Sequence, residues 1–295
     1  MMEKLIAKAD VLVEALPYIQ KFQDKIILVK FGGSAMEEQE TVHGALRDIA
    51  FLAAAGLKPI LVHGGGKAIT AELKKQNIEA VFINGLRFTC PQTIKVVDRV
   101  LHNPINASLV QFLQKDCGAE AAAVSGKNIL RCERITTLDK ETGEQRDLGF
   151  VGKVVNVDTA QINWILSRRQ IPVITPLACD MNGQVFNINA DMAACVIAAQ
   201  MKVTKLVFLS DVPGVLRNPE DPKSLISTIY CDQIPLMAQE GVISGGMLPK
   251  LESAAQAIAD GVGKVHLIDG RLRHALLLEI FTDQGIGTQI LDKNS

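Results

Sequence analysis

Two glycine-rich turns, each preceded by a short apolar run, are the first places where this sequence could bind an anion. They are Val29-Lys30-Phe31-Gly32-Gly33-Ser34 and Val62-His63-Gly64-Gly65-Gly66-Lys67. Glycine lets backbone N–H groups approach and surround a phosphate or a carboxylate. A plain tight turn explains either cluster alone about equally well. Because Lys30 directly precedes the first pair of glycines, the two turns together favour a binding site for phosphate groups.

Further polar residues stand at the ends of apolar runs or at the start of helical stretches. Asn187-Ile188-Asn189-Ala190-Asp191 opens an alanine-rich stretch, where one Asn or Asp would suffice as a helix cap. Asp211 follows a strand-like run and would also suit a turn. Lys250 follows the loop at Gly245-Gly246, although a lone lysine there is usually solvated. Arg87 could hold a carboxylate with its guanidinium or form a surface ion pair.

The familiar nucleotide-binding and metal-binding signatures are missing. No G-x-x-x-x-G-K-[ST] segment occurs, and no G-x-G-x-x-G segment follows an apolar run. The protein-kinase motifs are absent as well. None of the six cysteines forms a C-x-x-C pair, and no pair of histidines has zinc spacing. These absences disfavour P-loop ATPases and dinucleotide-dependent dehydrogenases, and we expect no metal site built by the protein alone.

Composition argues against several classes of partner. The 295 residues include 31 Lys and Arg and 32 Asp and Glu, with no basic stripe or acidic tail. Binding to nucleic acid therefore has no compositional support. No apolar run reaches membrane-spanning length, and the N-terminus lacks a signal-peptide core. We therefore expect no nucleic-acid or membrane partner and a cytoplasmic location.

The elements that must position these residues alternate between strands and helices. Residues 4–19 have the apolar spacing of an amphipathic helix, which Pro17 should kink or end. Residues 129–157 predict a β-hairpin with an exposed turn at 139–144. Strand-like segments lie at 26–29, 59–62, 171–175, 205–209 and 264–268, and helical stretches lie before residue 57 and at 67–76, 190–200 and 250–260. This rhythm predicts an α/β fold, a three-layer αβα sandwich with a mainly parallel central sheet covered on both faces.

Taken in order along the chain, these segments resemble the N-acetylglutamate kinases of the amino-acid kinase family. The resemblance covers nearly the whole chain, and the order of the motifs makes it specific although each motif alone is weak. The matching stretches are Val29-Lys30-Phe31-Gly32-Gly33-Ser34, Val62-His63-Gly64-Gly65-Gly66, Gly85-Leu86-Arg87, Asp147-Leu148-Gly149-Phe150-Val151-Gly152, Asn187-Ile188-Asn189-Ala190-Asp191, Leu209-Ser210-Asp211-Val212-Pro213-Gly214-Val215 and Gly245-Gly246-Met247-Leu248-Pro249-Lys250.

The resemblance implies an activity and a set of residues for it. The implied reaction is ATP-dependent phosphorylation of the side-chain carboxylate of N-acetyl-L-glutamate, a step of arginine biosynthesis. That carboxylate is ionised at neutral pH, so positioning and charge neutralisation should dominate catalysis. The implied catalytic residues are Lys30, Lys250 and Asp191, and the implied substrate-binding residues are Gly65, Gly66, Arg87 and Asn187. The residues implied at the phosphates and nucleotide of ATP, whose phosphates would carry Mg²⁺, are Gly32, Gly33, Asp211 and Gly246.

The two ends of the chain resemble the arginine-inhibited branch of this family, whose members are hexamers built as trimers of dimers. Arginine would bind between the N-terminal helix and the tail, at Glu279, Gly285 and Gly287. The implied organisation is an oligomerisation helix (1–22), an N-terminal lobe for acetylglutamate binding and dimerisation (23–195) and a C-terminal lobe for ATP (196–295). The plain alternative for the helix is packing on its own domain. The residues do not decide whether a signalling protein such as PII also binds.

The sequence departs from the family pattern in places, and other functions stay open. Cys90 stands where family members often have Asp, Asn103-Pro104-Ile105-Asn106 replaces a Gly-Lys-x-Asn stretch, and Asn128 replaces another Asp. Paired glycine turns and lysines would also suit a kinase that acts on glutamate, aspartate, carbamate or UMP. A catalytically idle arginine sensor is a further alternative, although it should have lost one of the catalytic residues.

Overall fold

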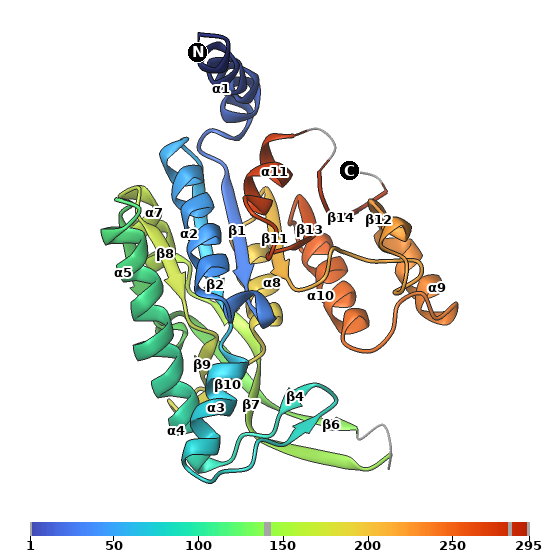
Figure 1. Cartoon of the computed structure of the whole chain (residues 1–295). Coiled ribbons are helices and arrows are strands. Elements are labelled where there is room, and N and C mark those ends of the chain that lie inside the picture. The colour runs from blue at the N-terminus through green and yellow to red at the C-terminus, as the bar shows by residue number, and fades with distance from the viewer. Residues whose placement is uncertain (1, 139–142, 283–284, 294–295) are drawn as a thin grey trace.

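An eight-stranded sheet forms the centre of the molecule. The computed structural model describes residues 2–138, 143–282 and 285–293. The sheet order is β12-β14-β13-β11-β1-β2-β8-β5, and its neighbours are parallel except for the antiparallel pair β13–β14 (Figure 1). The strands are β1 (Ile26–Phe31), β2 (Lys58–His63), β5 (Ala121–Val124), β8 (Ile171–Ile174), β11 (Lys205–Ser210), β12 (Thr228–Tyr230), β13 (Lys264–Asp269) and β14 (Thr288–Leu291).

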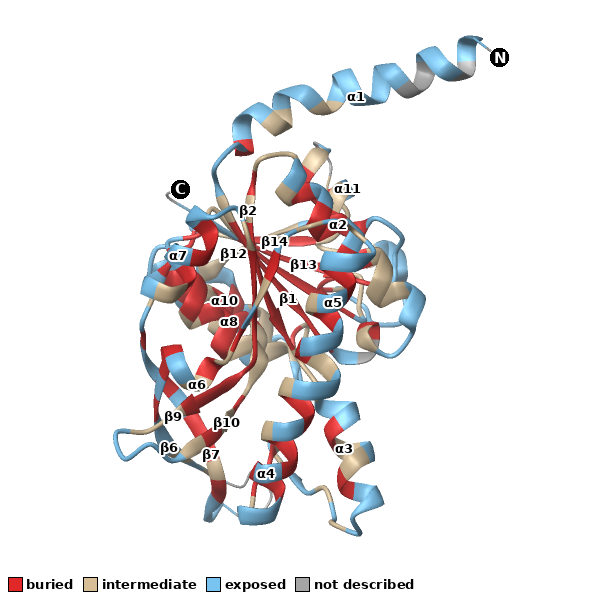
Figure 2. Ribbon diagram, turned by 90° about the vertical axis from the view of Figure 1, so that its left-hand side faces the viewer, coloured by how far each residue is buried: buried red, intermediate tan, exposed pale blue. Residues whose placement is uncertain are grey.

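Helices cover both faces of this sheet, and alternate residues of each strand point to opposite layers. On β1, Ile27, Val29 and Phe31 pack in one apolar core, while Leu28 packs in the other. The first layer contains α2 (Gln39–Ala54), α5 (Ala107–Lys115) and α11 (Ala275–Phe281), and the second contains α7 (Ala160–Ser167), α8 (Ala190–Gln200) and α10 (Met247–Ala259). Figure 2 shows the sheet between these two layers. The predicted three-layer α/β sandwich is therefore confirmed.

A smaller β-structure extends the carboxyl end of the sheet. It is a closed barrel of β6 (Leu130–Leu138), β7 (Gln145–Val157), β9 (Leu177–Cys179) and β10 (Val185–Ile188). The strands β6 and β7 form the predicted hairpin, and residues 139–142 of its predicted turn lie outside the described residues. Beside it lie the short hairpin β3 (Phe82–Ile83) and β4 (Leu86–Arg87) and the helices α3 (Gly66–Lys75) and α4 (Pro91–Val100) (Figure 1). The barrel itself was not predicted.

The remaining elements are short connections. A π-helical turn, η2 (Leu101–Asn106), joins α4 to α5 without a break. The other short helices are η1 (Gly33–Met36), α6 (Gly126–Ile129), η3 (Pro222–Ser224), η4 (Cys231–Gln233) and α9 (Ile234–Gln239). No helix among the described residues is both long enough and apolar enough to span a bilayer.

The N-terminal helix α1 (Met2–Phe22) projects from the body of the molecule (Figures 1 and 2). It continues through Pro17, so the prediction that it could end there is wrong. Proline has no N–H and so removes one hydrogen bond from the helix, but the hydrogen bonds of the turns on either side keep the helix continuous. Phe22 is buried and Tyr18 packs partly against the first core. The exposed apolar side chains of the helix are Met2, Leu5, Ile6, Val11, Leu12, Val13 and Leu16, so most of it does not pack on its own domain.

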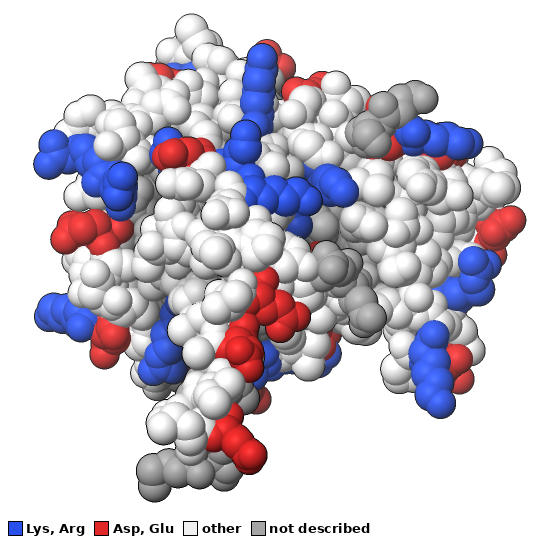
Figure 3. All heavy atoms as spheres, turned by 90° about the horizontal axis from the view of Figure 1, so that it is seen from above, with Lys and Arg blue, Asp and Glu red and all other residues white. Residues whose placement is uncertain are grey.

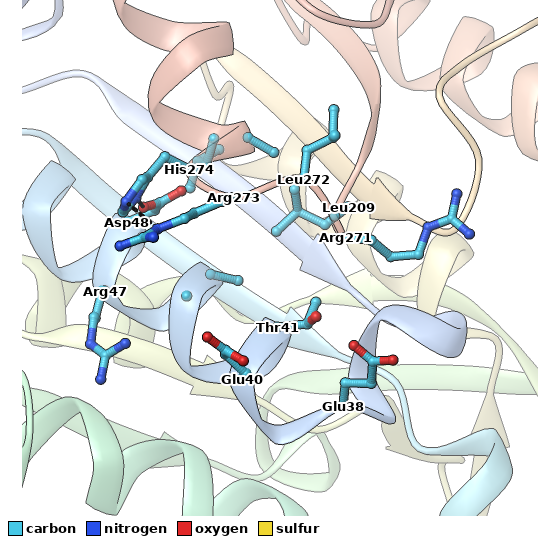
Figure 4. Close-up of a pocket in the computed structure, with 15 residues that line it drawn as sticks. Glu38, Glu40, Thr41, Arg47, Asp48, Leu209, Arg271, Leu272, Arg273 and His274 are labelled. Atoms are coloured by element: carbon cyan, nitrogen blue, oxygen red, sulfur yellow. Dashed lines mark hydrogen bonds and ion pairs between the residues drawn. The ribbon is translucent and has the colours of Figure 1, made fainter. Parts of the chain in front are cut away.

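A buried carboxylate ties α2 to the start of α11. Asp48 is 2% exposed, and Nδ1 of His274 lies 2.8 Å from its Oδ1. The backbone N–H groups of Leu276 and Leu277 also donate to Asp48, which therefore caps α11 from a different helix. Burial raises the pKa of Asp48, although His274 opposes this. Figure 4 shows Asp48 and His274 together at one side of a cavity of about 310 Å³ between α2 and residues 270–276.

We expect Asp48→Ala to lower the free energy of unfolding by about 2–3 kcal/mol, because it removes a cap and leaves buried N–H groups without a partner. Glu40→Ala is the matched control, since Glu40 is exposed on the same helix and lines the same cavity. The free energy of unfolding of Glu40→Ala should fall by less than about 1 kcal/mol. Urea denaturation measures both variants. Equal losses in the two would contradict the capping role of Asp48.

Candidate active site

One carboxylate joins two lysines from different parts of the fold. Lys30 is the next-to-last residue of β1, Asp191 lies in the first turn of α8, and Lys250 lies in the first turn of α10. The Nζ of Lys30 is 2.7 Å from Oδ1 of Asp191, and the Nζ of Lys250 is 3.4 Å from Oδ2. Each carboxylate oxygen therefore holds one ammonium group, and the structure brings the three predicted catalytic residues together.

The two lysines keep Asp191 ionised. Burial alone would raise the pKa of its carboxyl, but Lys30 and Lys250 outweigh this, and the pKa lies below its usual value. Two positive charges against one negative charge leave the group with a net positive charge. Such a group is suited to an anion with several charged oxygens.

Asp191 is not the cap of α8. The cap is Asn189, whose Oδ1 accepts hydrogen bonds from the N–H groups of Asp191 at 2.9 Å and Met192 at 3.2 Å. The alternative of a helix cap therefore applies to Asn189. Because its neighbour satisfies the helix end, the carboxylate of Asp191 is available for the two lysines.

The two glycine turns meet because β1 and β2 are parallel neighbours. The N–H of Gly64 donates to the carbonyl of Phe31 over 2.7 Å. A Cβ on Gly32 would lie 2.5 Å from the Nζ of Lys30, so any side chain there would displace this amine. Gly33 has φ of +74°, and a Cβ on it would lie 3.6 Å from the carboxylate of Asp211. Because Gly32 and Gly33 have no side chains, the amine of Lys30 and the carboxylate of Asp211 can lie beside the backbone of the first turn.

A cavity of about 370 Å³ opens beside these turns. Seven of the predicted site residues line it, namely Lys30, Gly33, Gly65, Gly66, Arg87, Asn187 and Asp191. Gly32, Asp211, Gly246 and Lys250 are not among its lining residues. Gly246 is exposed at the N-cap of α10, so the predicted loop ends there and Lys250 lies within the helix. The predicted substrate residues therefore share one cavity, and of the predicted nucleotide residues only Gly33 is among its lining residues.

Arg87 lines this cavity, and one nitrogen of its guanidinium has no hydrogen-bond partner in the described part of the chain. The side chain is 6% exposed, and its Nη2 donates to the carbonyl of Gly66 at 2.8 Å and to Oγ1 of Thr70 at 2.7 Å. The guanidinium lies 4.5 Å from the ring centre of Phe82. Its buried Nη1 has no hydrogen-bond partner among the described residues. A buried donor without a partner is costly, so this nitrogen is suited to an anionic ligand.

Asn187 is connected to Arg87 through a buried hydroxyl. Its Nδ2 donates to Oγ1 of Thr89 over 3.3 Å, and that hydroxyl donates to the carbonyl of Arg87 over 2.8 Å. Thr89 and the ring of Phe82 were not predicted as part of the site. Thr89 lies two residues after the matching stretch Gly85-Leu86-Arg87 and could have been inferred from that proximity, whereas nothing in the sequence pointed to Phe82 or to Thr70 on α3.

The predicted arginine-binding residues gather at the opposite end of the sheet, where β11 and β13 begin. Glu279, Gly285 and Gly287 line a depression of about 260 Å³ together with side chains of α1. Glu279 already has partners, since Nδ1 of His266 lies 2.6 Å from it and the N–H of Ile286 donates to it. Figure 3 shows this end of the molecule, where basic side chains gather near the centre.

Two of these residues also have plain packing reasons to be glycine. Gly285 has φ of +60°, and a Cβ on Gly287 would collide with the carbonyl of Leu267. Lysines surround the depression, and they include Lys21 and Lys205. Burial lowers the pKa of Lys205 to about 8. The depression therefore offers cationic groups for a carboxylate as well as one acid for a cation.

The described residues hold no group of three or more His, Cys, Asp and Glu side chains that could bind a metal ion. The carboxylate of Asp211 lies beside Gly33 of the first glycine turn. This arrangement fits a Mg²⁺ ion that arrives on the phosphates of a nucleotide, because Mg²⁺ seldom uses a cage made of protein alone.

Comparison with known proteins agrees with this geometry. A sequence profile of the amino acid kinase family matches residues 25–269. The chain is 44% identical over 289 residues to an acetylglutamate kinase from Akkermansia muciniphila, which covers 98% of this chain and 97% of that protein. It is 45% identical over 291 residues to an acetylglutamate kinase from Campylobacter jejuni, with 98% and 100% covered.

Solved structures share the fold. N-acetylglutamate synthase from Neisseria gonorrhoeae, in complex with coenzyme A and N-acetylglutamate, has a TM-score of 0.84 at 24% identity, and the match covers 97% of this chain and 63% of that one. Carbamate kinase from Giardia lamblia bound to AMP-PNP has a TM-score of 0.65 at 17% identity, covering 92% and 99%. Since the profile and the full-length relatives agree with this architecture, the chain belongs to the amino acid kinase family.

Proposed function

We propose that this chain transfers the terminal phosphoryl group of ATP to the side-chain carboxylate of N-acetylglutamate in arginine biosynthesis. The observation that carries the proposal is one cavity lined by the glycine turns, by the ion pair of Lys30 with Asp191 and by Arg87, whose buried Nη1 has no partner among the described residues. Acetylglutamate kinases that are 42–45% identical over nearly the full chain support the choice of acceptor.

The acceptor binds at two ends of the cavity. Its α-carboxylate accepts a hydrogen bond from Nη1 of Arg87, which is the donor left without a partner. Asn187 lies beside that end and contacts the acetamide. The side-chain carboxylate then reaches the N–H groups of Gly65 and Gly66 near Lys30. Binding the acceptor at both ends holds the attacking oxygen in line with the phosphoryl group. This positioning lowers the entropic part of the activation free energy of a bimolecular reaction.

Phosphoryl transfer then needs charge neutralisation more than proton transfer. A carboxylate oxygen forms the new bond to the terminal phosphorus, while the bond from that phosphorus to the bridging oxygen breaks and ADP leaves with the electron pair. No proton has to be removed from the acceptor. Lys30 and Lys250 neutralise the oxygens from the two sides, because Asp191 holds both ammonium groups in place. Mg²⁺ on the phosphates, beside Asp211, would neutralise part of the same charge.

The product is an acyl phosphate, which provides a direct test. Hydroxylamine converts it to a hydroxamate, so the purified chain can be incubated with Mg²⁺, ATP, hydroxylamine and one candidate acceptor at a time. We expect hydroxamate with N-acetylglutamate and at least tenfold less with glutamate or aspartate. Carbamate and UMP are tested by release of ADP. A stronger response to any of these acceptors would replace the proposed substrate, and no turnover with any would favour an idle sensor.

Asp191→Asn should lower turnover by about two to four orders of magnitude, although the shape barely changes. The variant loses the charge that holds and balances two lysines, and preorganised charge is worth several kcal/mol in phosphoryl transfer. Asp158→Asn is the matched control, because Asp158 is an exposed acid that does not line the cavity. Its Oδ1 accepts a hydrogen bond from the N–H of Ala160 at the start of α7. Steady-state kinetics measure both. Similar turnover in the two variants would show that Asp191 has no catalytic role.

Arg87→Lys should raise the KM for N-acetylglutamate by about tenfold or more and leave the KM for ATP nearly unchanged. The positive charge remains, but lysine cannot bond to Gly66 and Thr70 and at the same time present a second nitrogen to the ligand. Arg99→Lys serves as the control, since Arg99 is exposed on α4 and pairs with Glu72. If only the KM for ATP rises in Arg87→Lys, Arg87 belongs to the nucleotide site.

We further propose that arginine inhibits the enzyme from the depression at the other end of the sheet. Arginine carries two cationic groups and one carboxylate. Glu279 suits the guanidinium, and the lysines suit the carboxylate. The exposed apolar side chains of α1 form a surface that a second copy of the chain would cover, which supports a hexamer of interlaced dimers. Arginine inhibits only if it binds one arrangement of that assembly better than another.

Deletion of residues 1–16 should give an active dimer that arginine inhibits at least tenfold less. This deletion removes the exposed apolar surface and keeps Tyr18 and Phe22, which pack on the body. Size-exclusion chromatography gives the oligomeric state, and assays with added arginine give the inhibition. A truncated hexamer, or inhibition equal to that of the full chain, would refute the proposed role of α1.

A further inference from the structure

His63 is a buried polar side chain that the reaction as described does not use. It is the last residue of β2 and directly precedes Gly64-Gly65-Gly66, the second glycine turn. The side chain is 0% exposed. Its Nδ1 lies 2.9 Å from the carbonyl oxygen of Gly64, and its Nε2 lies 3.1 Å from Nδ2 of Asn106. Both ring nitrogens therefore have a partner, and one partner belongs to the turn that lines the cavity.

The neighbours of His63 fix the position of its proton. Nδ2 of Asn106 lies 2.9 Å from the carbonyl oxygen of Val173, so this atom of the side-chain amide must be the NH₂ nitrogen. Its second hydrogen points to Nε2 of His63, which therefore accepts. The proton of the neutral ring is then on Nδ1, which donates to the carbonyl of Gly64. Burial lowers the pKa of His63 to about 4, in agreement with a neutral ring.

Asn106 reaches His63 because of the π-helical turn. Residues Leu101–Asn106 form η2 between α4 and α5, and Asn106 is 3% exposed. A π-turn changes the angular position of the side chains that follow it and often occurs at functional sites. Asn106 thus links this helix to β8, through Val173, and to β2, through His63.

The hydrogen bond to Gly64 determines where the next N–H points. In a trans peptide the carbonyl and the N–H point in opposite directions. The carbonyl of Gly64 faces the buried ring of His63, so the N–H of Gly65 points away from that ring, and Gly65 lines the cavity. The N–H of Gly64 is fixed separately, by the carbonyl of Phe31.

We propose that His63 is a positioning residue, whose Nδ1–H holds the Gly64–Gly65 peptide so that the N–H of Gly65 can donate to the phosphoryl group or the carboxylate in transfer. This inference rests on the proposed kinase function. Glycine at these positions leaves the peptide free to rotate, so a fixed donor needs an external hydrogen bond. His63 supplies that bond from the core, and Asn106 keeps its proton on the correct nitrogen.

Two variants of His63 separate this role from simple filling of the core. In His63→Asn the amide nitrogen can occupy the place of Nδ1 and donate to Gly64. In His63→Gln the amide reaches the place of Nε2 and can bond to Asn106, but it does not reach Gly64. We expect kcat within about fivefold of wild type for His63→Asn and about 10- to 100-fold lower for His63→Gln, with the KM for ATP within about twofold in both. Equal kcat in the two variants would overturn the proposal.

Crystal structures of the two variants provide a measurement that does not depend on the acceptor. The carbonyl of Gly64 should face residue 63 in His63→Asn and turn away from it in His63→Gln. The same peptide orientation in both variants would refute the positioning role even if N-acetylglutamate is the correct substrate. Conversely, if the wild-type enzyme prefers another acceptor, the ratio of kcat values is measured with that acceptor, and the positioning role is judged separately from the proposed function.

Discussion

The arrangement of the site depends on one buried carboxylate between two ammonium groups. Lys30 comes from the central sheet, Lys250 comes from α10, and without Asp191 their charges would repel each other in a region with little water. Other features follow from this constraint. Gly32 must lack a side chain because the amine of Lys30 occupies that space. Asn189 must cap α8 so that the carboxylate of Asp191 stays available.

The parallel sheet separates the proposed chemistry from the proposed regulation. Lys30 and both glycine turns lie at the carboxyl ends of β1 and β2, where open α/β sheets bind ligands. The depression around Glu279 lies near the amino ends of β11 and β13. Since strands buried on both faces move as a unit, a ligand at one end can act on the other only by shifting whole layers or neighbouring copies. The exposed helix α1, which reaches that depression, is placed to make such a connection.

The sequence predicted those parts of the molecule that depend on local patterns. Continuous apolar runs such as 26–29 and 206–209 predicted the buried parallel strands, since a strand covered on both faces needs no polar alternation. The small barrel was missed because strands as short as β9 and β10 have too few residues to show a period. Spacing alone could not bring Lys30 together with Lys250, 220 positions later, and only the family resemblance proposed that meeting. The tie between His63 and Asn106 depends on a π-turn, which has no sequence signature.

A crystal structure of the chain with N-acetylglutamate and a non-hydrolysable ATP analogue tests the account most directly. We expect the α-carboxylate of the acceptor on Nη1 of Arg87, and its side-chain carboxylate in line with the terminal phosphate. That phosphate should lie between the ammonium groups of Lys30 and Lys250, with Asp191 still bonded to both. If the phosphate lies away from these lysines, or if Asp191 binds neither of them in the complex, the carboxylate does not organise catalysis and the account is wrong.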